Sequence, residues 1–184
     1  MLIGPACLAQ LSDKQIHDLK SGRAPDDTSY VYWLPYVKGK SYLLVQGANS
    51  NMSHQNELSY DFKMKKGSKV CASRDGIVVG ARGDSENGGL KPENYSDGNY
   101  VIIRHADGSE AYYWHLDKNG AYVKEGDQVT KGQVIGASGN TGYTAFAHLH
   151  FQVMDVNGKQ ILVRFNTRKG NRYLKPGNWY RRRS

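Results

Sequence analysis

Acidic residues are absent from the chain after Asp155, although it continues to position 184. The basic residues of this final stretch are Lys159, Arg164, Arg168, Lys169, Arg172, Lys175, Arg181, Arg182 and Arg183. The net charge of +8 therefore originates here, because the first 155 residues hold 16 basic and 17 acidic groups. A basic segment of this kind can bind any polyanion, including nucleic acid, anionic lipid or an anionic cell-envelope polymer, or can simply be a solvated surface.

Long apolar runs are also missing, and no run approaches the ~20 residues that a membrane-spanning helix needs. Extended apolar periodicity of the helical kind is scarce, whereas glycine (21 residues) and tyrosine (13 residues) are abundant. This composition favours a turn-rich β protein. A length of 184 residues is enough for one domain with a hydrophobic core.

Cysteine is rare, with only Cys7 and Cys71 present. Cys71 lies in an apolar run and is expected to be a small buried hydrophobe. Residues 1–9 are apolar and resemble the last part of a signal peptide, with a small-residue cleavage site before Gln10, although a positively charged leader is missing. We therefore expect a secreted or periplasmic protein.

Short β-strands separated by turn residues account for most of the chain. A serine-capped helix is predicted at residues 12–19, ending at Ser21-Gly22. The predicted strands are residues 30–37, 41–46, 69–72, 76–81, 100–104, 110–115, 133–137, 149–153 and 160–163. The first of these contains Pro35, so it is expected at a sheet edge. The pattern predicts a mainly β fold, either one antiparallel sheet or two sheets packed as a sandwich, with a short N-terminal helix.

Three segments follow from this pattern. Residues 1–28 form an N-terminal segment, residues 29–165 form the main domain, and residues 166–184 form a basic C-terminal tail. Within the main domain, the stretch 83–98 is long, polar and rich in glycine. A loop of that length is usually functional or mobile.

The most informative motif is Ala-His-Leu-His-Phe at residues 147–151. Because side chains alternate between the two faces of a strand, His148 and His150 are expected on one face, with Leu149 and Phe151 in the core. Two imidazoles side by side suit a first-row metal such as Zn²⁺. Many strands carry two surface histidines, so the pair alone leaves both interpretations open.

Additional ligands are available elsewhere in the chain. Asp61 lies between Tyr60 and Phe62 on a predicted strand, and a carboxylate there is costly to bury unless it is paired or bound to metal. His54, on the preceding loop, can reach the same point. His115 ends another apolar run. Each of these residues alone is more simply a hydrogen-bonded polar group, but together with the His-x-His pair they suffice for a mononuclear zinc hydrolase.

Many ordered segments between residues 53 and 153 resemble the LytM/lysostaphin-type zinc endopeptidases, also called β-lytic or duplicated-hybrid-motif metallopeptidases. The matching segments are Ser-His followed by Tyr-Asp-Phe, Gly67 to Ala72, Asp75-Gly76-Ile77-Val78, residues 103–108, Tyr113-Trp114-His115-Leu116, residues 123–136, Ser138-Gly139-Asn140-Thr141-Gly142 and the His-Leu-His strand. The resemblance implies the duplicated-hybrid-motif β fold and a zinc endopeptidase that cuts peptide cross-links of bacterial peptidoglycan.

The resemblance also implies roles for five residues. His54, Asp61 and His150 become the zinc ligands, and His115 and His148 become the catalytic pair beside the metal. The spacing from His54 to Asp61 exceeds the His-x-x-x-Asp of the best-known members, which makes His54 the weakest match. His105 matches no functional position and is read as structural. The loop 83–98 and the turn 138–147 are candidates for the walls of a substrate cleft. Tyr143 and Phe146 are either substrate contacts there or side chains that simply pack within their loops.

The sequence also offers two alternatives to an enzyme, a non-catalytic module and a nucleic-acid binder. A non-catalytic regulator or wall-binding module with the same fold usually lacks some of these five groups, all of which are present here. A nucleic-acid binder would use the basic tail with its aromatic residues Tyr173, Trp179 and Tyr180. The tail contains no recognisable module and the rest of the chain is slightly acidic, so no nucleic-acid partner is expected. The sequence does not indicate an oligomeric state.

Overall fold

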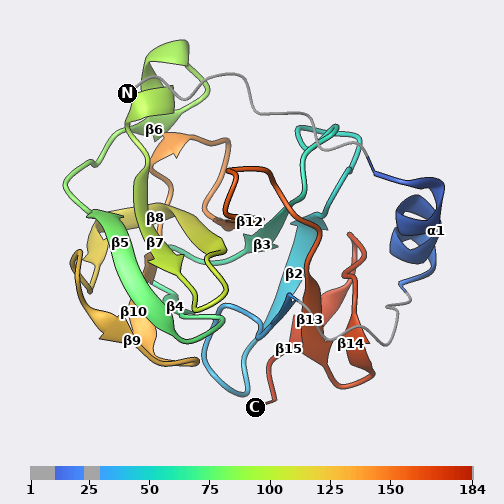
Figure 1. Ribbon diagram of the computed structural model, residues 1–184. Coiled ribbons are helices and arrows are strands. Elements are labelled where there is room, and N and C mark those ends of the chain that lie inside the picture. Colours follow the sequence, from blue (N-terminus) through green and yellow to red (C-terminus); the bar gives the residue numbers. More distant parts are fainter. Residues whose placement is uncertain (1–10, 23–29, 184) are drawn as a thin grey trace.

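The computed structural model describes residues 11–22 and 30–183 (Figure 1). The helices are α1 (Asp13–Ser21) and the 3-10 helix η1 (Pro92–Ser96). The strands are β1 (Val31–Tyr32), β2 (Ser41–Gln46), β3 (Ser59–Lys63), β4 (Lys69–Cys71), β5 (Gly76–Arg82), β6 (Gly88–Gly89), β7 (Asn99–Arg104), β8 (Glu110–Ala121), β9 (Gln128–Val129), β10 (Val134–Ser138), β11 (Gly142–Tyr143), β12 (Leu149–Met154), β13 (Arg164–Thr167), β14 (Gly170–Arg172) and β15 (Trp179–Arg181). The mainly β fold is confirmed, and the expected signal-peptide segment, residues 1–9, lies outside the described residues.

A ten-stranded antiparallel sheet dominates the structure. Its main path runs β15-β2-β3-β12-β8-β7-β5-β9, and β10 joins it by pairing with both β8 and β4. Two smaller sheets, β1-β13-β14 and β11-β6, each contain a parallel pair. The three strands β3, β12 and β8 are adjacent at the centre of the large sheet, and they carry most of the residues singled out in the sequence.

The hydrophobic core lies between the large sheet and the β1-β13-β14 sheet. Phe165 of β13 packs edge-to-face against Tyr60, Phe62 and Phe151 of the large sheet, with ring centroids 5.0–6.0 Å apart. All four rings are fully buried. Each large ring removed from water contributes about 2–3 kcal/mol, so β13 is an integral part of the fold.

The helix α1 begins and ends as the sequence predicts. Ser12 and Gln15 form a reciprocal capping box at its start. Gly22 follows its last turn with a φ of 69°, a left-handed conformation in which glycine has no Cβ to clash. Among the described residues, no helix is both long and apolar enough to cross a membrane.

Two predicted strands are corrected by the structure. Residues 30–37 contribute only the two-residue strand β1, because Tyr30 has a positive φ of 54° and Pro35 has no N–H to donate. In the predicted strand 160–163, only Gln160 forms a bridge, with Met154. The regular strand starts just afterwards, at β13.

The basic C-terminal segment is folded into the sheets. Strand β15 pairs antiparallel with β2 and forms one edge of the large sheet. Tyr173 and Leu174 are buried, and Arg182 is buried with its Nη1 donating to the carbonyl of Tyr36 at 2.6 Å. Residues 166–183 are thus packed on the domain rather than extending from it.

Candidate metal centre

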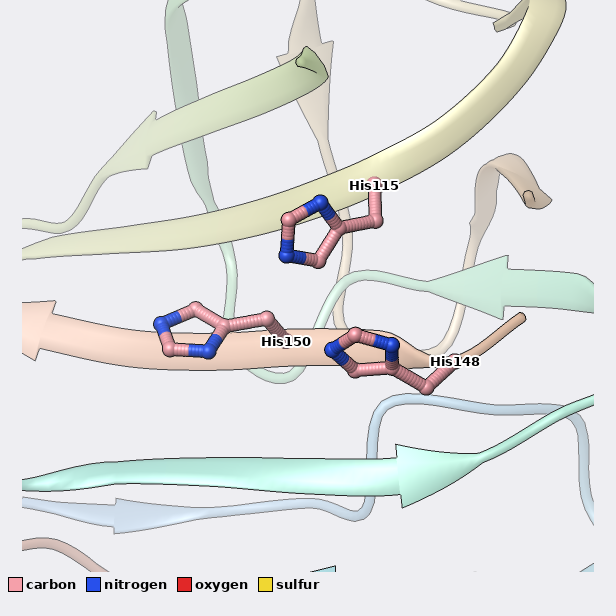
Figure 2. Close-up of side chains that lie close together, drawn as sticks. All are labelled: His115, His148 and His150. Atoms are coloured by element: carbon pink, nitrogen blue, oxygen red, sulfur yellow. The ribbon is translucent and has the colours of Figure 1, made fainter. Parts of the chain in front are cut away.

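Strand β12 presents its two histidines on the face opposite the core. Leu149, Phe151 and Val153 are fully buried on one side. His148, immediately before the strand, and His150 project from the other side, where His115 of β8 approaches them (Figure 2). The alternation expected from the sequence therefore holds, and it places two imidazoles on one polar face.

Asp61 lies directly opposite His150 in the register of β3 and β12. Its carboxylate is 3% exposed. Because an ionised carboxylate only accepts hydrogen bonds, the His150 Nδ1 atom, 2.9 Å from Oδ1, must donate. His54 Nε2 lies 3.1 Å from Oδ2. Burial raises the pKa of Asp61, but the hydrogen bonds from His150 and His54 outweigh burial and hold this pKa well below its usual value.

His54 arrives on the loop between β2 and β3, and Gln46 ties that loop to the carboxylate. The Gln46 Nε2 atom donates to Asp61 Oδ2 at 2.8 Å and to Ser53 Oγ at 2.7 Å. The Gln46 Oε1 atom accepts from the backbone N–H of Ser53 at 2.9 Å. Ser53 immediately precedes His54, so one buried amide fixes the approach of the histidine. Sequence reasoning missed Gln46, whose only signal was a polar residue ending an apolar strand.

His115 reaches the site through a β-bulge. On β7, Tyr100 pairs with Trp114 and Asn99 pairs with Leu116, so His115 between them has no partner residue. It adopts a φ of 63°, which is unusual for a residue other than glycine. Regular alternation would place it with buried Ala111 and Tyr113 on the core face. The extra residue re-aims its ring to the polar face.

The rings of His115 and His148 lie close together, with centroids 4.6 Å apart. His115 Nδ1 is 2.7 Å from the carbonyl oxygen of Thr141, and His148 Nδ1 is 2.8 Å from that of Phe146. A carbonyl oxygen only accepts, so Nδ1 carries the proton in both rings. Each neutral ring consequently keeps a lone pair on Nε2.

Both rings favour the neutral form. Burial, reinforced by the neighbouring His148 and His150, lowers the pKa of His115 to about 3. Burial also lowers the pKa of His148, although Asp61 opposes the shift. Burial acts in the same direction on His150, but the hydrogen bond from its ring to Asp61 prevails and raises its pKa. The three imidazoles therefore differ in the direction of their pKa shifts although they share one face.

Two overlapping groups of side chains can hold a metal ion. His54, Asp61 and His150 form one, and His115, His148 and His150 form the other, with ligand atoms within 4.8 Å of one another in each. Zinc ligands lie about 2.0–2.2 Å from the metal, so the ligand atoms of a tetrahedral site are about 3.4 Å apart. In the first group the two contacts of Asp61, at 2.9 and 3.1 Å, are shorter than this spacing, and the group combines nitrogen donors with a compensating carboxylate.

A second polar contact lies behind His150. Its Nε2 atom is 3.5 Å from Glu57 Oε1 and 3.4 Å from Gln152 Oε1. Both ring nitrogens of His150 therefore face acceptors, which fixes the ring orientation and contributes to its raised pKa. Neither residue was identified from the sequence, because nothing in the local pattern distinguishes them from surface residues.

The two segments expected to wall a cleft are joined to each other. Strand β6 of the loop 83–98 pairs with β11 of the turn 138–147. The rings of Tyr95 and Tyr143 stack with centroids 4.2 Å apart, and Phe146 lies 5.1 Å from the His148 ring. By contrast, His105 lies just after the end of β7 and is buried, with Nδ1 against the carbonyl oxygen of Asp75.

Comparisons with known proteins identify the relatives of this chain. Residues 55–162 match Peptidase family M23, a segment that starts just after His54. The chain is 40% identical over 101 residues to the peptidoglycan DD-endopeptidase ShyA of Vibrio cholerae, covering 55% of this chain and 20% of that protein. It is 37% identical over 135 residues to lysostaphin of Staphylococcus simulans, covering 72% of this chain and 24% of that protein. The chain thus spans a quarter or less of the length of these relatives.

Solved structures show the same fold. Lysostaphin from Staphylococcus simulans superposes with a TM-score of 0.53 at 34% identity, covering 65% of this chain and 46% of that one. A zinc-containing peptidase from Vibrio cholerae also gives 0.53, at 25% identity, covering 72% and 39%. The ordered motifs, the β fold and the family match together place the chain in peptidase family M23, among the LytM/lysostaphin-type proteins.

Proposed function

We propose that this protein is a zinc-dependent endopeptidase that hydrolyses peptide cross-links of bacterial peptidoglycan. The observation that carries the proposal is the convergence of five groups, His54, Asp61, His115, His148 and His150, on one face of β3, β12 and β8. The names of the relatives, a peptidoglycan endopeptidase and lysostaphin, support the substrate class. Because peptidoglycan lies outside the cytoplasm, we place the protein in the cell envelope, secreted or periplasmic.

His54, Asp61 and His150 would hold the metal. Their donor set of two imidazoles and one carboxylate is typical of catalytic zinc sites, which leave one position for water. Zinc would act as a Lewis acid and lower the pKa of its bound water toward ~7. Asp61 offsets the charge of the cation, and Gln46 keeps Asp61 and the His54 loop in register.

His115 and His148 would move protons. Each presents an unprotonated Nε2, because Nδ1 is engaged by a backbone carbonyl. Such a nitrogen accepts a proton from an attacking water and, once protonated, donates to a developing oxyanion or a leaving amine. Thr144 Oγ1, 3.2 Å from His148 Nδ1, further restricts that ring. The Tyr143 and Phe146 side chains are the proposed contacts for the substrate peptide.

The decisive experiment combines metal analysis with peptide release from purified peptidoglycan sacculi. We expect one zinc per chain, and release of peptides that stops on chelation and returns when zinc is restored. The released fragments identify the bond that is cut. Bound zinc without release from any wall chemistry would favour the non-catalytic regulator, and a chain that binds no zinc would contradict the proposal.

A further inference from the structure

A cavity of about 430 Å³ lies between the end of α1, strand β14 and strand β15, remote in sequence from the candidate metal centre. We call it the basic groove. Its charged lining residues are Arg168, Lys169, Arg172, Lys175, Arg181 and Arg183. No aspartate or glutamate is among the described residues that line it. Its volume is in the range of ordinary ligand sites.

The cations of the basic groove have no acidic partner within the ranges 11–22 and 30–183. Elsewhere, ion pairs between the described residues join Lys14 to Asp18, Lys66 to Asp117, Arg74 to Asp107, Arg82 to Asp84, Arg104 to Glu110 and Lys118 to Glu86. None of the six groove cations forms such a pair within the described part of the chain. The Arg172 Nε–H is buried and has no hydrogen-bond partner there. An unpartnered buried donor of this kind is costly and uncommon in native structures.

Neighbouring arginines near the β15 edge of the large sheet differ in burial. Arg182 is buried, packs its guanidinium over Trp33 at 4.8 Å and bonds the carbonyl of Tyr36, so it serves the structure. Arg181 and Arg183, on either side of it, are exposed and line the groove. Trp179 also lines it and is 68% exposed. A large exposed indole beside cations provides a stacking surface next to charge.

One lining residue of the basic groove, Trp179, lies on the sheet face that carries the candidate metal centre. Trp179 pairs with Leu43 of β2, and Leu43 pairs with Lys63 of β3. Residues opposite each other in an antiparallel pair share a face, and Lys63 lies on the same face as Asp61, two residues away. A long molecule lying across this face can therefore contact the groove and the site together.

We propose that the basic groove binds an anionic glycopolymer of the cell wall, with carboxylate or phosphate groups on its cations and sugar rings on Trp179. The proposal rests on the proposed function for the identity of the wall as the ligand. A concave site with one stacking residue fits discrete anionic groups on a sugar polymer better than a planar membrane. A nucleic acid would require several exposed aromatic rings on which successive bases stack, whereas Trp179 is the one exposed aromatic residue among the described residues that line the groove.

The test compares two triple variants of the full chain loaded with zinc. One variant, Arg168→Gln/Lys169→Gln/Arg181→Gln, removes three exposed cations from the groove. The matched control, Lys38→Gln/Lys124→Gln/Lys159→Gln, removes three exposed cations elsewhere. Co-sedimentation measures binding to intact sacculi, to sacculi stripped of phosphate polymers, to duplex DNA and to vesicles of anionic phospholipid. Hydrolysis of a short soluble cross-link peptide measures the catalytic site separately.

We expect the groove variant to bind sacculi roughly tenfold more weakly, since each exposed charge contributes modestly to binding. The control should bind as the parent does, and all three proteins should hydrolyse the soluble peptide equally. Loss of binding on stripping assigns the ligand to wall phosphate, and retention assigns it to peptide carboxylates. Equal weakening in the control, or tighter binding of DNA or vesicles than of sacculi, would overturn the proposal. Failure to cleave the peptide would instead contradict the proposed function.

Discussion

The candidate metal centre and the basic groove handle charge in opposite ways. Around Asp61 the charged and polar groups are buried and mostly bonded to one another, so the geometry is set before any ligand arrives. In the groove, six cations have no anionic partner among the residues that the structure describes. The first arrangement suits chemistry, which depends on exact positions. The second suits adhesion, which depends on net charge and weakens with salt.

The largest effect should follow removal of the central charge of the buried cluster. Asp61→Asn is expected to abolish zinc binding and to lower hydrolysis by a factor on the order of 10³ or more. It should also destabilise the fold by about 3 kcal/mol, because buried imidazoles lose their anionic partner. Metal analysis, hydrolysis rates and urea unfolding measure these effects. Asp84→Asn, at an exposed position, is the matched control and should change none of them.

The next prediction separates the two overlapping groups of metal ligands. His115→Ala and His148→Ala should each lower hydrolysis by about 10²–10⁴-fold, as expected for lost proton transfer, while zinc content is unchanged. His54→Ala should lose zinc. Metal analysis of the purified variants decides the matter. Retention of zinc by the His54 variant with loss from the His115 variant would reverse the assignment of roles.

A smaller effect is expected at Gln46, which holds the ligands without touching the metal. Gln46→Ala should weaken zinc affinity by about 10–100-fold, because partners of metal ligands typically contribute that much. Competition with a coloured chelator gives the affinity. Gln55→Ala changes an exposed glutamine in the loop between β2 and β3, next to His54, and should retain the parental zinc affinity. If both variants bind zinc equally well, the hydrogen bonds of Gln46 are not needed to hold His54 beside Asp61.

Lowering the pH should reduce the free energy of unfolding, because the fold keeps His115 neutral. In the metal-free protein its folded pKa is about 3, below the unfolded value of 6.5. Between these values the unfolded state binds more protons, so stability falls as the pH falls. The parent should lose about 1–2 kcal/mol more than His115→Gln between about pH 7 and pH 5. The raised pKa of His150 acts in the opposite direction in both proteins. Urea unfolding across pH, with His17→Gln as control, tests the difference.

The smallest effect should come from the groove. The variant Arg168→Gln/Lys169→Gln/Arg181→Gln removes charges that repel one another and touch no anion in the described part of the chain. We expect its free energy of unfolding to equal the parental value or exceed it by a few tenths of a kcal/mol. Thermal unfolding at low and high salt measures this. A clear loss of stability would mean that these cations serve the fold, as Arg182 does.

Local patterns predicted the parts of the molecule that depend on neighbours in sequence. Alternation placed His148 and His150 opposite Leu149 and Phe151, and capping residues located α1. The resemblance to a family, rather than any local pattern, brought the five site residues into one hypothesis. Their assignment to metal binding and proton transfer stays a prediction.

Other features depend on contacts between distant segments and left no trace in local patterns. The bulge that turns His115 out of the core arises in the pairing of β8 with β7. The sequence of β8 alone does not predict where that pairing shifts register. The predicted tail proved to contain an edge strand, since β15 finds its partner only in β2. Gln46 gains meaning only once Asp61 and Ser53 are beside it.

The pairing of β15 with β2 also means that one edge of β2 stays unpaired during much of the synthesis of the chain. Leu43 and Trp179 are partners although 136 residues separate them. A ribosome adds about 5–20 residues per second, so β2 waits about 7–27 s with one edge uncovered. Unpaired strand edges recruit other chains. The nascent protein should therefore be most vulnerable to aggregation in this interval, when the apolar Leu43 and Leu44 have been made and their cover has not.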